Sequence, residues 1–208
     1  MKSLQQRINE GIFDADEHAL AKEIKSLNPE NKEELIKIMS RLIKDQGNKA
    51  NLNIINTSQI TDMSYLFKDF EEFEGDISQW DVSNVKNMSH MFHGIAGASS
   101  GEFRSDISNW DVSNVEDMSG MFWWVVIPDL DLNKWNVSKV KNMSHMFSDG
   151  YARVNISKWN VSNVEDMSEM FGSLDTESVT SFTGDISKWI VSQVKNMEGM
   201  FAGNSDFA

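Results

Sequence analysis

The stretch "DISQWDVSNVKNMSHMF", Asp76–Phe92, returns as "DISNWDVSNVEDMSGMF" from Asp106 to Phe122. Trp, Val, both Met and Phe keep their places in the two copies. Alignment on the last residue reveals six copies, spaced 25, 30, 25, 24 and 30 residues apart, which end at Phe67, Phe92, Phe122, Phe147, Phe171 and Phe201. Units of about 20–30 residues cannot bury an apolar face alone, so neighbouring copies must pack on each other.

Each unit contains two patterns of different period. "DIS" alternates in polarity and predicts a short strand with Ile77 pointing inward. "VSNVKNMSHMF" places Val85, Met88 and Phe92 on one face of a short helix, with Ser83 at the N-cap position. The units therefore predict an α/β solenoid of leucine-rich-repeat type, in which six units of about 25–30 residues each contribute one short parallel strand and one short helix.

The first fifty residues carry a different pattern. "NPENKEELIKIMSRLIKDQG" predicts a helix with Asn28 as N-cap, Pro29 in the first turn and Gly47 as the stop. "DADEHALAKEIKSL" before it predicts a shorter helix. We expect residues 1–50 to form a helical N-terminal cap on the first turn of the solenoid, and residues 51–208 to form the repeats.

The repeats resemble a known family. "DISQWDVSNVKNMSHMF" and its copies are similar to the BspA-like leucine-rich repeats of bacteria, including mycoplasma surface lipoproteins, over about residues 28–201. The resemblance implies an elongated repeat fold that is used for binding, often at cell surfaces, and it supplies no catalytic residues. The surface members carry a signal and a lipid-anchor cysteine, which this sequence does not show.

Composition narrows the functional classes. The 208 residues are 40% hydrophobic and include no cysteine, which excludes disulfides, thiolate zinc sites and cysteine nucleophiles. The net charge of −13 arises from residues 51–208 and should repel nucleic acid and anionic membranes while attracting a basic partner. Without a signal sequence or an apolar run of about 18 residues, the sequence predicts a cytoplasmic protein that is not inserted in a membrane. A surface location would need an export signal.

A polar column along the predicted strands is a candidate binding strip. It accompanies the inward-pointing residues on the opposite side of each strand, where stacked carboxylates would repel one another, share a cation or receive Lys and Arg from a partner. The alternative is that each Asp only accepts backbone hydrogen bonds. The column comprises Asp76, Asp106, Asp131, Asn155 and Asp185, together with Ser78, Ser108, Asn133, Ser157 and Ser187.

Aromatic and histidine residues offer further candidates. "FWWVVIP", residues 122–128, places apolar residues in an inter-unit loop, so Trp123 and Trp124 are either a binding hot spot or a lid over the core. His90 and His93 have a spacing that can bind zinc, but no further ligand is visible and surface polarity explains them better. The repeated Met, Phe and Trp residues are interpreted as core.

No nucleophile–base pair, phosphate loop or metal motif is present, so we expect a protein that is not an enzyme and uses no cofactor or metal. The leading hypothesis is a protein-binding module that uses the concave strand face and the inter-repeat loops. The alternatives are an acidic mimic that inhibits a basic nucleic-acid-handling protein, as a phage or mobile element might encode, and a surface adhesin. The apolar edge of the C-terminal repeat lacks a predicted cover, which leaves two alternatives: a homodimer through this repeat, or a monomer that Phe207 seals by folding back.

Overall fold

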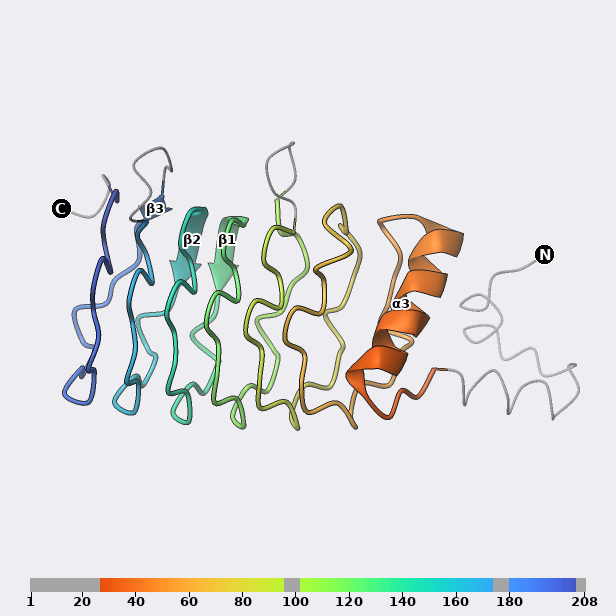
Figure 1. Cartoon of the computed structure of the whole chain (residues 1–208), viewed down its shortest axis with the longest axis horizontal. Helices are drawn as coiled ribbons and strands as arrows, with labels where there is room; N and C mark the ends of the chain where they lie inside the picture. Colours follow the sequence, from red (N-terminus) through yellow and green to blue (C-terminus); the bar gives the residue numbers. More distant parts are fainter. Residues whose placement is uncertain (1–26, 96–101, 174–179, 205–208) are drawn as a thin grey trace, which may run out of the picture.

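The computed structural model describes residues 27–95, 102–173 and 180–204. Successive sequence repeats lie side by side along the long axis, with helix α3 at the N-terminal end of the described chain and the last repeat at the other end (Figure 1). Parallel bridges join equivalent residues of neighbouring repeats, through Asp62, Asn87, Asp117, Asn142, Asp166 and Asn196 in turn.

Helix α3, Lys32–Gln46, begins three residues later than the sequence predicted. Asn31, not Asn28, is the N-cap, and its side chain accepts a hydrogen bond of 3.0 Å from the Glu34 backbone N–H. Gly47 ends the helix at φ 82°, as predicted, and its N–H donates to the Ile43 carbonyl. The other predicted helix falls almost entirely in residues 1–26, outside the described residues, and the role of residues 1–50 as a cap stays a prediction.

Helix α3 contacts the first repeat through one buried face and one ion pair. Leu35, Met39 and Leu42 are buried in the core shared with the repeats. The Lys32 ammonium lies 2.7 Å from Asp62 and also donates to the Ser64 hydroxyl. Burial raises the pKa of Asp62, but the hydrogen bonds that Asp62 accepts from Lys32 and Ser64 outweigh this effect and hold the pKa below its usual value.

Three short strands form one open parallel sheet in the order β1-β2-β3. They span Val126–Asp131, Tyr151–Asn155 and Ser181–Phe182. Val126 pairs with Tyr151, and Tyr151 pairs with Ser181. The register between β1 and β2 shifts between Ile127 and Leu130, next to Pro128, which has no N–H to donate to a ladder.

The predicted α/β solenoid is wrong. Among the described residues, the only helix is α3, and the strands are confined to one three-stranded sheet that does not close. No repeat contains the predicted short helix, and the stretch from Val82 to Phe92 is a series of turns with one bridge. The strands also fall elsewhere than predicted, since β1 and β2 end at Asp131 and Asn155, where strands were expected to begin.

Backbone geometry explains why the repeats are not helical. In the second repeat, Met88 N–H donates to the Asp117 carbonyl of the next repeat instead of to a carbonyl four residues earlier. His90 then adopts φ 53°, a left-handed conformation that stops a helix. The same position is left-handed in every repeat, at Tyr65, His90, Gly120, His145, Glu169 and Gly199. We call these six residues the left-handed column.

The core consists of columns of equivalent side chains, as the sequence predicted for the Met, Phe and Trp residues. The Phe rings stack at centroid distances of 5.2–5.9 Å along Phe67, Phe92, Phe122, Phe147, Phe171 and Phe201. In the Trp column each indole N–H donates to a carbonyl of the preceding repeat, for example Trp135 to Ile107 at 3.0 Å. This column comprises Trp80, Trp110, Trp135, Trp159 and Trp189. Packing and hydrogen bonding therefore both tie a repeat to its neighbours.

Candidate functional site

The predicted polar column lies at solvent-exposed corners of the repeats. At each corner the Asp carboxylate accepts the backbone N–H two residues later, as Asp76 does from Ser78 at 2.9 Å and Asp131 from Asn133 at 3.0 Å. Asn155 differs, since its side-chain oxygen accepts from the Ser157 hydroxyl. The column therefore consists of Asx turns, in which the side chain shapes its own backbone.

These bonds also fix the charge state of the corners. Hydrogen bonds from the hydroxyl and backbone N–H of Ser108 hold the pKa of Asp106 below its usual value. The backbone N–H and hydroxyl of Ser187 do the same for Asp185. Asp106 and Asp185 thus stay ionised at neutral pH and contribute to the acidic surface.

Part of the column lines a shared hollow. Asp131, Asn155 and Asp185, at the ends of neighbouring sheet segments, line a shallow depression of about 510 Å³. Arg153 also lines it, and its guanidinium lies 3.3 Å from Asp129. The hollow brings no nucleophile beside a base, so it offers an anionic contact surface and not a reaction centre.

The same turn recurs at two further corners, which sequence reasoning missed. One is present in all six repeats and the other in the first five, since Ile190 occupies its position in the last repeat. Ser83 N–H donates to Asp81 at 3.0 Å, and Ser89 N–H donates to Asn87 at 2.9 Å. Ser83 was interpreted as a helix N-cap, which is wrong because no helix follows it. The signal was present, since Asp or Asn followed two residues later by Ser occurs three times in "DISQWDVSNVKNMS".

The segment of residues 122–128 divides into four parts. The Phe122 side chain is in the core, and Trp123 is half-buried on the surface of the repeats. Trp124 is 52% exposed and adopts φ 61°. Residues from Val126 onward form β1 instead of the predicted loop. Trp124 therefore does not cover the core, and its left-handed backbone costs roughly 1–2 kcal/mol relative to an ordinary conformation.

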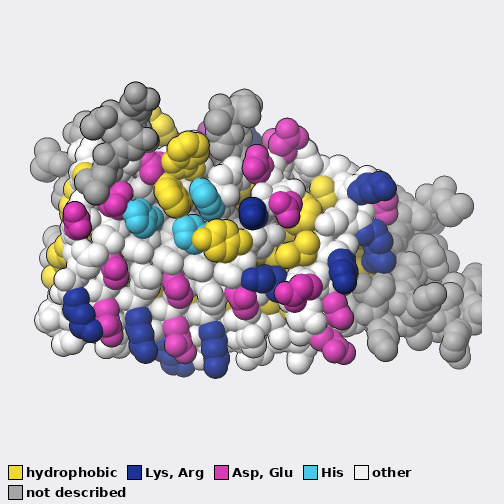
Figure 2. Space-filling model, in the orientation of Figure 1, with side chains coloured by type: hydrophobic (Ala, Val, Ile, Leu, Met, Phe, Trp, Pro, Cys, Tyr) yellow, Lys and Arg dark blue, Asp and Glu magenta, His cyan; other side chains and the backbone are white. Residues whose placement is uncertain are grey.

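Trp123 is the centre of a ring cluster that the sequence did not predict. His93 stacks on its indole at 4.8 Å and 9°, and His145 stacks at 5.3 Å and 26°. His90 lies at 5.7 Å and in turn stacks on Tyr65 at 4.5 Å. We call these five residues the ring cluster. Figure 2 shows the histidine side chains gathered beside hydrophobic side chains on one face.

Gly120 makes room for this arrangement. A Cβ at Gly120 would lie 2.5 Å from ring atoms of His90, so the absence of a side chain lets the imidazole occupy that space. The Nδ1 atoms of His90 and His145 are buried without a hydrogen-bond partner. Glu169 Oε2 is 3.7 Å from His145 Nδ1, and the Trp123 indole N–H donates to Asp149 at 2.7 Å.

The ring cluster keeps two histidines neutral. Burial lowers the pKa of His90, and the neighbouring His93 and His145 lower it further against the opposing effect of Asp117. Burial likewise lowers the pKa of His93, against Glu71. Within the described ranges, no three His, Asp or Glu side chains are placed to hold a metal ion. His90 and His93 are therefore neutral members of the ring stack at neutral pH.

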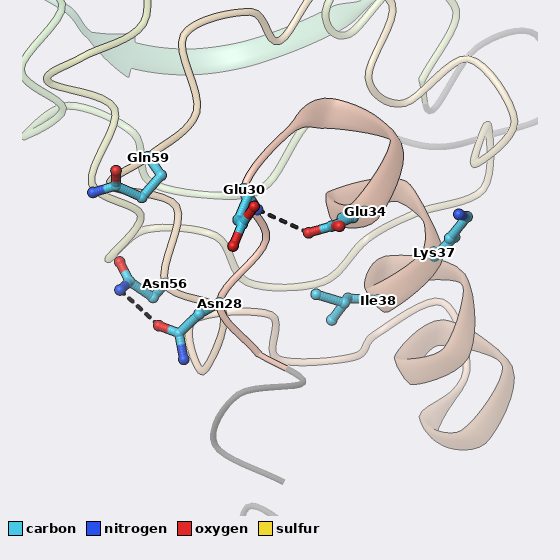
Figure 3. A pocket seen from close by; sticks show the side chains of 7 residues that line it. All are labelled: Asn28, Glu30, Glu34, Lys37, Ile38, Asn56 and Gln59. Carbon is cyan, nitrogen blue, oxygen red and sulfur yellow. Dashed lines mark hydrogen bonds between the residues drawn. The ribbon is translucent and has the colours of Figure 1, made fainter. Parts of the chain in front are cut away.

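A second hollow lies between α3 and the first repeat (Figure 3). Its polar lining is already engaged, since Asn56 donates to Asn28 at 2.8 Å and Glu30 N–H donates to Glu34 at 2.9 Å. Ile38 and Lys37 complete one wall. The hollow shows no convergent set of free polar groups, so it is a weaker candidate than the ring cluster.

None of the described helical residues forms a segment with the length and apolar character needed to cross a bilayer.

The columns of equivalent core residues and the recurring Asx-turn corners show that the chain is a repeat protein. The family model described as "Mycoplasma protein of unknown function, DUF285" matches residues 36–153 and 125–208. These matches span most of the chain, so it belongs to this family. No curated protein and no solved structure matches it.

Proposed function

We propose that this chain is a non-enzymatic protein-recognition module whose contact surface is formed by Trp124 and the ring cluster, which includes Tyr65. The observation that carries the proposal is Trp124. A large aromatic side chain is 52% exposed in a left-handed conformation. The equivalent residue in two other repeats is glycine, Gly94 and Gly203, which adopts this conformation without strain.

Tyr65 supports the same proposal. It is 48% exposed, adopts φ 53° and stacks on His90 at the end of the ring cluster. Exposed Trp and Tyr are the residues that dominate binding energy at protein interfaces. Two strained and exposed aromatic residues at one ring stack reduce stability without burying apolar area, which favours a role in contact with another molecule.

The resemblance of the repeats to BspA-like surface proteins belongs to this proposal. Those repeats are used for binding, and the family match to a mycoplasma family supports the relation at a coarser level. An extracellular adhesin is thus one setting for the proposed recognition.

The acidic-mimic hypothesis rests on a different observation, the ionised corners at Asp76, Asp106 and Asp185. Binding of a basic partner through the negative charge of these corners should weaken steeply with added salt.

A displayed library of random peptides tests the proposed recognition. The full chain is the bait, and parallel selections use Trp124→Ser and Tyr151→Ser. Tyr151 is a matched control because it is 50% exposed but lies on β2 outside the ring cluster. We expect peptides that the unchanged chain and Tyr151→Ser enrich and that Trp124→Ser does not. Equal enrichment by all three proteins, or enrichment by none, would contradict the proposal.

A further inference from the structure

Carboxylates surround the ring cluster. Glu71 acts electrostatically on His93 and Asp117 on His90, while Asp149 accepts the Trp123 indole N–H and Glu169 lies beside His145. Four carboxylates therefore face three imidazoles, and Lys68 is an exposed cation three residues after Tyr65. With neutral histidines the four carboxylates give this surface a charge of about −4 before Lys68 is counted.

The combination of exposed aromatic faces and a carboxylate border fits a cationic ligand. Lys and Arg side chains are attracted to the faces of Trp and Tyr, and the attraction grows when a nearby carboxylate pairs with the same cation. Trp124, which follows Trp123 in the chain, is 52% exposed, and Tyr65, which stacks on His90, is 48% exposed. An apolar partner would remove water from the carboxylates without offering them a positive charge, so the charge pattern disfavours it.

Protonation would reverse this preference. Because Nδ1 of His90 is buried without a hydrogen-bond partner, an added proton places a positive charge inside the ring cluster. Protonation of His90 and His93 would change the local charge from about −4 to about −2, and these cations would lie on the rings of Tyr65 and Trp123. The same rings that support the surface can thus expel a cationic partner.

We propose that the surface of Trp124 and the ring cluster binds a lysine- or arginine-bearing protein segment at neutral pH and releases it when His90 and His93 become protonated. This inference rests on the proposed recognition function. It adds the chemistry of the partner and a control by acid.

A fluorescein-labelled peptide of alternating Arg and Ser tests the inference on the full chain by fluorescence anisotropy, at about pH 7.5 and about pH 5.5 in about 0.15 M salt. At the higher pH we expect Trp124→Ser to weaken binding about tenfold and Tyr151→Ser to change it less than about twofold. Both substitutions preserve net charge, so general attraction to an acidic protein affects them equally. Equal affinities for Trp124→Ser and Tyr151→Ser would overturn the cationic site.

The acid control is measured as the ratio of the two dissociation constants. We expect the ratio to be about ten or more for the unchanged chain and to fall towards one for a double variant, His90→Gln and His93→Gln. If that variant does not fold, His93→Gln alone should lower the ratio. An unchanged ratio would overturn the release mechanism. If library peptides depend on Trp124 but the Arg–Ser peptide does not, only this inference fails and the recognition function stands.

Discussion

The Phe column and the left-handed column lie two residues apart in every repeat but differ in composition. The first contains Phe in all six repeats, and its rings stack through the interior. The second contains Tyr, His, Gly, His, Glu and Gly. A left-handed backbone favours Gly, so four of these six residues are retained at a cost in strain. The Phe column is therefore fixed by packing inside the fold, and we propose that the left-handed column serves contacts with a partner.

The largest effect should follow a change in the Phe column. Phe122 stacks on Phe92 at 5.4 Å and on Phe147 at 5.5 Å and is fully buried. We expect Phe122→Ala to lower the free energy of unfolding by about 3–5 kcal/mol in urea denaturation. Phe201→Ala is the matched control, because Phe201 is only partly buried and should cost less. Equal losses would mean that the stack is not the main source of stability.

A change in the left-handed column should have an intermediate effect. Gly120→Ala introduces strain and also a Cβ that displaces His90, whereas Gly94→Ala introduces strain where no atom lies within 4 Å. We expect Gly94→Ala to cost about 1 kcal/mol, and Gly120→Ala to cost more and to shift the His90 ring resonances in proton NMR spectra. An unshifted His90 spectrum in Gly120→Ala would show that the ring cluster is not assembled as described.

Acid should weaken the fold through the same cluster. The pKa values of His90 and His93 are lower in the folded chain than the ordinary 6.5, so the unfolded chain binds protons more readily. Stability is therefore complete above about pH 6.5 and decreases as the pH falls through the lowered pKa values. Urea midpoints between about pH 8 and about pH 5 measure this decline. His90→Gln combined with His93→Gln should flatten it, and a rise in stability on acidification would contradict the account.

The smallest effect should come from an exposed column in which charge alternates. Lys86, Glu116, Lys141, Glu165 and Lys195 follow one another in neighbouring repeats, and Lys195 lies 2.6 Å from Glu165. Figure 2 shows basic and acidic side chains alternating in a row on this face. Lys141→Glu places three Glu residues in sequence along the column and should lower the melting temperature slightly, with the loss reduced by salt. Lys141→Gln is the control, and identical melting temperatures would show that the alternation has no energetic role.

The sequence predicted the core of the first five repeats correctly, because Phe, Trp and Met recur in phase and burial follows from that repetition. In the last repeat Met197 is exposed, and Trp189 and Phe201 are only partly buried. The short helix predicted in each repeat was wrong. The spacing of Val85, Met88 and Phe92 suits a helix, but it also suits a series of Asx turns whose backbone N–H groups donate to the next repeat. The turn residues Asp81 and Asn87 held the better signal. The pattern within a single repeat could not predict the ring cluster, because its members come from four repeats and contact one another only through ring stacking.

The most direct test of the central claim combines stability and binding measurements on Trp124→Gly and Trp124→Ala. Glycine relieves the strain at φ 61° and alanine does not. We therefore expect the Gly variant to be about 1 kcal/mol more stable than the Ala variant and no less stable than the unchanged chain. Both variants should lose the Trp124-dependent peptides. If both instead lose about 2 kcal/mol or more of stability and still capture the peptides, Trp124 covers the core and the recognition account is wrong.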